Sequence, residues 1–144
     1  MKLSTKCRYG TRAMIEIARH YKEGPVKRKD ISRGQRISSA YLENILMALK
    51  SRNLLRTVRG ANGGFMLEVP PSRITMFQIV SALEGSTVPV ECVDKSDACD
   101  QSAACAARKL WQELYNAQVA VLKKTTLQTL VDWAESKKPL DYSI

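Results

Sequence analysis

Apolar residues at helical spacing predict three consecutive helices in the first third of the chain. The first covers residues 3–21, and the Gly24-Pro25 pair ends it. A short second helix covers residues 28–33 and is expected to end at Gly34. The third begins at Ser38, a residue type that caps helix N-termini well. Its apolar residues share one face: Leu42, Ile45, Leu46 and Leu49.

A short helix, a tight turn and a longer helix are the pattern of a helix-turn-helix. The second helix of such a pair lies in the major groove of DNA and offers its first residues to base edges. The serines at its start serve equally as helix caps, and capping is compatible with a DNA contact. The candidate DNA-binding residues of the two helices are Arg28, Ser38, Ser39, Ala40, Tyr41 and Glu43.

Residues 53–69 contain two short β-prone runs around a turn rich in glycine and asparagine, which predicts a β-hairpin. A hairpin after a helix-turn-helix is a wing. Arg59 and Gly60 lie at its tip, where an arginine suits a DNA minor groove or a phosphate. The alternative, a nucleotide-binding phosphate loop, lacks the Gly-Lys-Ser/Thr ending, and no long helix follows at once.

Two further helical patterns follow the wing. One covers residues 75–83, with Thr75 as its cap and Gly85 as its end. The other runs from residue 106 to 136, with apolar residues four and three positions apart from Leu110 onward. A domain this small cannot bury so long a stripe, so we expect a second subunit to cover it and form a homodimer. The alternative is that the helix folds back on its own domain.

These patterns predict a mainly α fold with a small β-hairpin. We expect a winged helix-turn-helix domain over residues 1–85, a cysteine-containing loop over 86–105, a long C-terminal dimerisation helix over 106–136 and a tail over 137–144.

The net charge of +9 is concentrated in the first half of the 144-residue chain. Residues 1–73 hold 16 Lys and Arg against 5 Asp and Glu, whereas residues 74–144 hold 7 against 9. This concentration favours a polyanionic partner, although a solvated basic face gives the same count. No apolar run approaches the roughly 18 residues of a membrane span, and we expect a cytoplasmic protein with no membrane partner.

Three of the four cysteines lie close together, at Cys92, Cys99 and Cys105. Cytosolic thiols stay reduced, so this grouping favours metal or redox chemistry over disulfides. Structural zinc sites use cysteines two to four residues apart, whereas these are separated by six and by five residues. The spacing favours a larger iron–sulfur cluster, with zinc, a redox thiol and inert thiols left open. No Cys-x-x-Cys pair or acid–base group accompanies them, so we do not expect an enzyme.

Several motifs along nearly the whole chain resemble the Rrf family of bacterial winged-helix regulators. The resemblance implies a homodimer on palindromic operator DNA, with an iron–sulfur cluster controlling the transcription of cluster-biogenesis genes. Family members that respond to nitric oxide, and cluster-free members that sense a metabolite or thiol oxidation in cysteine metabolism, are the alternatives. The motifs are residues 1–10 (MKLSTKCRYG), 41–43 (YLE), 58–65 (VRGANGGF), 79–85 (IVSALEG), 90–92 (VEC) and 110–111 (LW).

The resemblance leaves the fourth cluster ligand open. Arg108 stands where the cluster regulators have a histidine ligand, and Arg8 stands where nitric-oxide sensors have a carboxylate from the partner subunit. Our hypothesis is that Cys7 of one subunit ligates the other subunit's cluster, with a [2Fe–2S] cluster favoured over [4Fe–4S]. A buried structural Cys7 is the alternative, and His20 is expected at the surface. The competing ligands are Asp94, Asp97, Asp100 and an exogenous thiol.

Overall fold

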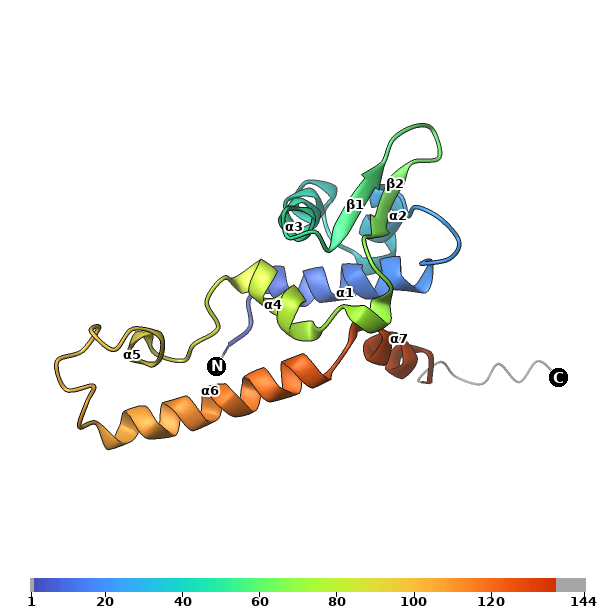
Figure 1. Cartoon of the computed structure of the whole chain (residues 1–144). Helices are drawn as coiled ribbons and strands as arrows, with labels where there is room; N and C mark the ends of the chain where they lie inside the picture. The colour runs from blue at the N-terminus through green and yellow to red at the C-terminus, as the bar shows by residue number, and fades with distance from the viewer. Residues whose placement is uncertain (1, 137–144) are drawn as a thin grey trace.

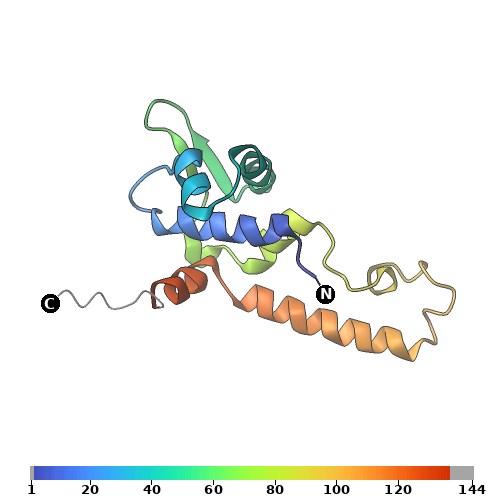
Figure 2. The ribbon, with the colours of Figure 1, turned by 180° about the vertical axis from the view of Figure 1, so that it is seen from behind.

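A computed structural model describes residues 2–136 of the protein, so the predicted tail over 137–144 lies outside the described residues. The chain forms a helical body with a two-stranded wing and an arm that projects from it (Figure 1). The arm consists of the cysteine loop and the helix that follows it, and the reverse view shows the same projection (Figure 2).

Helix α1 (Thr5–Arg19) crosses the centre of the body. It starts at Ser4, whose Oγ accepts the N–H of Cys7 at 3.0 Å. Helices α2 (Arg28–Gln35) and α3 (Ser39–Ser51) pack against it and against each other. The predicted inner face of α3 is confirmed, because its four apolar residues are all buried: Leu42, Ile45, Leu46 and Leu49.

The predicted end of α2, at residue 33, is two residues too early. Gly34 lies inside the helix, which continues to Gln35. Arg36 ends it in the left-handed region, with φ 54°. An arginine gives no local signal for that conformation, which glycine or asparagine usually adopts.

The wing is confirmed as an antiparallel hairpin of β1 (Leu55–Val58) and β2 (Gly64–Leu67). A backbone bridge from Val26 to Phe65 joins it to the segment before α2, with both N–H···O distances at 2.9 Å. Strand β2 therefore joins the hairpin to the segment between α1 and α2. A 3-10 turn, η1 (Pro71–Arg73), follows it.

Helix α4 (Met76–Glu84) begins at the predicted cap and ends at the predicted glycine. Thr75 forms a reciprocal capping box with Gln78, and Gly85 follows the helix with φ 78°. The loop that comes next is almost without regular structure and contains the single short helix α5 (Glu91–Asp94).

The prediction of one uninterrupted helix over residues 106–136 is wrong. The chain forms α6 (Ala106–Lys124) and α7 (Leu127–Ser136), separated by Thr125 and Thr126. The break is extended backbone that bridges to the start of α4, because the N–H of Met76 donates to the Thr125 carbonyl at 2.9 Å. Two adjacent β-branched residues weaken a helix, and the Thr126 hydroxyl accepts the N–H of Thr129 at 3.2 Å to start the next one.

Helix α7 folds back on its own domain, which was the alternative to its being covered by a second subunit. Leu127 is 0% exposed and Val131 is 5% exposed, and both belong to the core of the body. The face of α6 is different, because none of its residues is buried. Across the described range, residues 2–136, we find no helix with the length and apolar character that crossing a membrane requires.

Candidate DNA-binding surface and cysteine loop

The angle between α2 and α3 is fixed by two isoleucines and one hydroxyl. Ile31 on α2 and Ile37 in the turn are buried in the core. Ser32 on α2 donates its hydroxyl proton to the Ile37 carbonyl at 2.6 Å. Because these contacts hold the turn, the first residues of α3 are presented on a rigid support.

The residues predicted for the start of α3 have different roles. The Oγ of Ser38 accepts the N–H of Tyr41 at 3.4 Å, so this serine caps the helix. Tyr41 packs edge-on against Tyr9 of α1, with ring centroids 6.2 Å apart. Ser39 and Ala40 are exposed and make no such contact, so they are the open positions of this helix start.

Arg28 and Glu43, both predicted as DNA contacts, form an ion pair with each other between α2 and α3. Both side chains remain partly exposed. An isolated carboxylate beside DNA phosphates would be repelled, and the guanidinium of Arg28 neutralises this one. The sequence placed both residues at the surface, but their pairing depends on the helix crossing.

The wing carries its arginine as predicted, on a turn that only small residues can form. Arg59 is exposed, and Gly60 has φ 113° with no atom near the position of a Cβ. At Gly63 a Cβ would stand 2.1 Å from the Val58 carbonyl oxygen, so this position excludes any side chain. Lys50 of α3 donates to Thr57 of β1 at 2.8 Å, which fixes the wing relative to α3.

Sequence reasoning missed a supporting cluster under the helix-turn-helix. Arg12 of α1 donates to the Gln35 carbonyl at 2.8 Å and to its side-chain oxygen at 3.0 Å. The same guanidinium lies 5.6 Å from the ring of Tyr9, which in turn supports Tyr41. No spacing rule in the sequence reveals this contact, because its partners are 23 residues apart.

The loop cysteines are free thiols on separate parts of the arm. Cys92 lies in α5, Cys99 is exposed in the following turns, and Cys105 immediately precedes α6. Within residues 2–136, no three His, Cys, Asp or Glu side chains converge as they would around a metal ion. The structure therefore does not bring the three predicted ligands together.

Arg108, which stands at the position compared above with the histidine of the cluster regulators, joins the start of α6 to the middle of the loop. Its Nε donates to the Cys92 carbonyl at 2.7 Å, so it links α6 to α5. Inside the loop, the hydroxyl of Ser102 donates to the carbonyl of Ser96 at 2.5 Å. The loop contacts α6 and itself, and it lies away from the core of the body (Figure 1).

Cys7 does not reach the loop cysteines. Its side chain is 1% exposed and belongs to the core of its own protomer. Burial, followed by the negative charge and hydrogen bond of Glu84, raises the pKa of this thiol from 9.0 to about 11. This enclosure and the raised pKa favour the alternative of a buried structural Cys7 over the hypothesis of a ligand to the partner's cluster. His20 lies at the surface as expected, where Nδ1 contacts a carboxylate oxygen of Glu23 at 2.5 Å.

Comparison with known proteins places most of the chain in one family. Residues 3–133 match Rrf2, described as "Iron-dependent Transcriptional regulator". The chain is 38% identical over 131 residues to protein rrf2 of Nitratidesulfovibrio vulgaris, covering 91% of this chain and 87% of that protein.

Two solved structures share the fold at 37% and 32% sequence identity. CymR (YrzC), the global cysteine regulator of B. subtilis, matches with a TM-score of 0.79 and 37% identity over 92% of this chain and 98% of its own. IscR of T. potens matches with a TM-score of 0.80 and 32% identity over 99% of this chain and 95% of its own. The winged-helix fold is thereby confirmed, as is the expectation of a regulator and not an enzyme. The chain belongs to the Rrf2 family of DNA-binding transcriptional regulators.

Proposed function

We propose that this regulator is a cytoplasmic homodimer whose operator affinity is set by an iron–sulfur cluster on Cys92, Cys99 and Cys105. The observation that carries the proposal is the contrast among the four cysteines. Cys7 is enclosed in the core, whereas the other three lie on a loop in which no residue is buried. Three thiols without a packing role are available for ligation. The proposed targets are genes of iron–sulfur cluster biogenesis.

The donor set fits such a cluster in its chemistry, because thiolates are the ligands that hold iron–sulfur clusters in proteins. The three cysteine side chains do not converge in this structure, so cluster binding requires the loop to bring them together. Gathering costs little packing, because no residue of the loop is buried. With Cys7 enclosed, we take the exposed loop carboxylates as the source of the fourth ligand, and we keep [2Fe–2S] as the favoured form. These carboxylates are Asp94, Asp97 and Asp100.

The path from the loop to the DNA-binding surface runs through packed helices. The loop leaves the end of α4, and α4 packs on α1, which supports α2 and α3. When bound, the cluster supplies a redox-sensitive link among the three thiolates. Drawing the three cysteines together shifts the ends of α4 and α6, and this shift is passed through α1 to the DNA-binding helices. A coupling of about 1 to 3 kcal/mol would change operator affinity about 5- to 150-fold.

The proposed dimer is formed through α6. Three of its large apolar side chains are exposed, Leu110 at 54%, Leu114 at 51% and Val121 at 64%. They follow one another at steps of four and seven along the helix, so they form one stripe. A second copy of the same stripe covers it in a two-fold arrangement, which also places two winged domains for paired half-sites.

Two variants separate DNA binding from cluster binding. Anaerobic reconstitution with iron and sulfide should give visible charge-transfer bands in the wild type and in Arg59→Ala, but not in Cys99→Ala. Arg59→Ala should weaken operator binding about 5-fold and reduce the salt dependence by about one phosphate contact, because it removes one exposed wing cation. Arg73→Ala, an exposed arginine on η1 outside the proposed surface, is the matched control.

Colourless wild-type protein after reconstitution would overturn the cluster proposal. Loss of both properties in either variant would indicate misfolding instead of separate roles.

A cluster-free regulator that senses a metabolite or thiol oxidation is the second candidate. It is favoured by the separation of the three thiols and by Arg108 at the histidine position. It is also favoured by the similarity to the global cysteine regulator of B. subtilis. A nitric-oxide response requires the cluster and shares its test. A colourless protein whose operator affinity changes with thiol oxidant would establish the cluster-free mode.

A further inference from the structure

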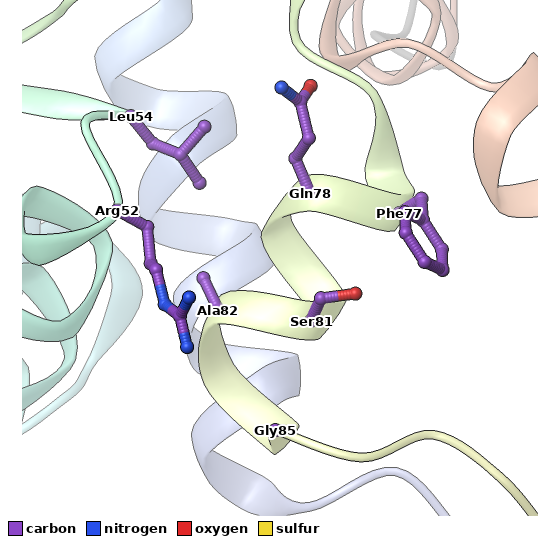
Figure 3. Close-up of a pocket in the computed structure, with 7 residues that line it drawn as sticks. All are labelled: Arg52, Leu54, Phe77, Gln78, Ser81, Ala82 and Gly85. Atoms are coloured by element: carbon purple, nitrogen blue, oxygen red, sulfur yellow. The ribbon is translucent and has the colours of Figure 1, made fainter. Parts of the chain in front are cut away.

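A shallow hollow of about 400 Å³ lies on the body between the segment after α3 and the outer face of α4 (Figure 3). We call it the α4 hollow and define it by six of its lining residues. Its volume is within the range of small-molecule sites, at roughly 300 to 1,000 Å³. The six residues are Arg52, Leu54, Phe77, Gln78, Ser81 and Ala82.

The polar groups of the α4 hollow are hydrogen-bond donors. Among residues 2–136, the side chains of Arg52 and Ser81 have no hydrogen-bond or ion-pair partner. Gln78 uses its oxygen to accept the Thr75 N–H at 2.8 Å, so its amide N–H groups remain. A site that offers a guanidinium, an amide N–H and a hydroxyl matches an anion with two acceptor atoms.

The charged group that lines the hollow is the cation Arg52. None of its lining residues is acidic. The nearest carboxylate in sequence, Glu84, points to the other side of α4 and accepts the Ser4 N–H at 2.7 Å. Lys123 does not line the hollow, but its ammonium lies 5.2 Å from the centroid of the Phe77 ring, which does. An anion in the hollow would therefore face the Arg52 guanidinium, with a second cation next to Phe77.

The remaining lining is apolar. Leu54 reaches toward α4 from one side, and Phe77 stands on the other (Figure 3). Ala82 lies on α4 beside the Arg52 guanidinium (Figure 3). We propose that the α4 hollow binds a small organic carboxylate with a compact apolar group. The carboxylate pairs with Arg52 and the apolar group contacts Leu54 and Phe77.

Such a ligand would bridge two functional parts of the protein. Arg52 directly follows the recognition helix α3, and Gly85 at the end of the hollow begins the cysteine loop. Occupancy fixes the end of α3 against α4, so the ligand would act as an effector of DNA binding. The inference does not depend on the cluster, because none of its residues is a loop cysteine.

Phenylacetate is a suitable probe, with phenylacetamide as its uncharged counterpart. Titration of the full-length protein by calorimetry and amide NMR should give saturable binding with a Kd on the order of 1 mM or tighter. The shifts should centre on Ser81, Ala82 and Gly85. The neutral amide should bind at least about 10-fold more weakly, because it loses the charge-assisted pair.

Matched arginine variants test the assignment. Arg52→Gln should weaken phenylacetate binding at least about 10-fold, and Arg52→Lys should lie between it and the wild type, since lysine keeps the charge without the bidentate geometry. Arg56→Gln, an exposed arginine on β1 outside the hollow, should stay within about 2-fold. Equal losses in the Arg52 and Arg56 variants, equal binding of the amide, or no saturable shift would overturn the proposal. Unchanged binding to Cys99→Ala would show that the site is independent of the cluster proposal.

Discussion

Cys7 and the three loop cysteines have the same side chain but lie in opposite surroundings. The loop thiols are partly or fully exposed, whereas Cys7 is packed in the core beside Glu84. Burial raises the pKa of the Cys7 thiol most, and Glu84 raises it further. Glu84 also accepts the Ser4 N–H, which holds the start of α1 to the end of α4. A residue type that the sequence offers as a ligand is here a protonated core group.

The raised pKa of Cys7 makes stability depend on alkaline pH. The folded thiol keeps its proton up to about pH 11, whereas the unfolded thiol loses it near its usual pKa of 9.0. Since the folded state binds more protons between these values, its stability falls as pH rises through this window, by roughly 2 to 3 kcal/mol.

Urea unfolding of wild type and Cys7→Ala at pH 8 and at pH 10.5 measures this effect. The difference in unfolding free energy between the two proteins should shrink at the higher pH, because only the wild type carries the thiol. Lysine and tyrosine titrations are common to both proteins and cancel. A difference that is the same at both pH values would contradict the prediction.

At the scale of elements, α1 meets α4 at a glycine. A Cβ at Gly10 would stand 2.4 Å from Cδ1 of Leu83 and 3.1 Å from Cγ2 of Ile45. Both neighbours are buried, so neither has free space to move into. The close approach of α1 to α4, and with it the connection from loop to DNA-binding helices, depends on the absence of a side chain.

Two glycine substitutions should therefore have opposite effects. Gly10→Ala should destabilise the protein by about 1 to 3 kcal/mol, since the extra methyl group overpacks the α1–α4 contact. Gly34→Ala should stabilise it by about 0.5 to 1 kcal/mol, because Gly34 lies inside α2 with nothing within 4 Å of its Cβ position. Urea unfolding measures both, and a destabilised Gly34→Ala would contradict the helical role assigned to that residue.

At the scale of the whole molecule, the apolar residues of α6 and of α7 have different roles. Helix α7 buries its residues against its own body, and α6 leaves its stripe on the projecting arm. Trp133 on α7 is also exposed, at 56%, but Leu127 and Val131 anchor its helix to the core. The proposed dimer therefore involves α6 and leaves α7 as part of each subunit.

Leu114→Lys should convert the dimer to monomers, because it places a charge in the middle of the α6 stripe. Light scattering should then give a mass of 16.1 kDa per particle in place of twice that value. Operator affinity should fall as well, since one winged domain reads only one half-site. Asn116→Lys adds the same charge at another exposed position of α6 and should remain dimeric. A dimeric Leu114→Lys would exclude the stripe as the interface.

Local patterns were sufficient for most of the fold. Ser4 was not foreseen as a cap, but Ser38 and Thr75 were, and both start their helices as expected. The wing was predicted from its β-prone runs and its Gly/Asn turn, because the turn chemistry is encoded within a few residues. The motifs of the family, spread over the chain, identified the regulator class.

What the sequence by itself determined were the features that depend on neighbouring residues: helix faces, caps, the hairpin and the cysteine-rich loop. Only the tertiary structure decided where the distant partners meet. It broke the last helix at Thr125 and Thr126, where backbone bridges to α4 replace helical hydrogen bonds. It enclosed Cys7 with Glu84, and it paired Arg28 with Glu43. Each of these contacts joins residues far apart in the chain, and their geometry depends on how helices cross, which no local spacing encodes.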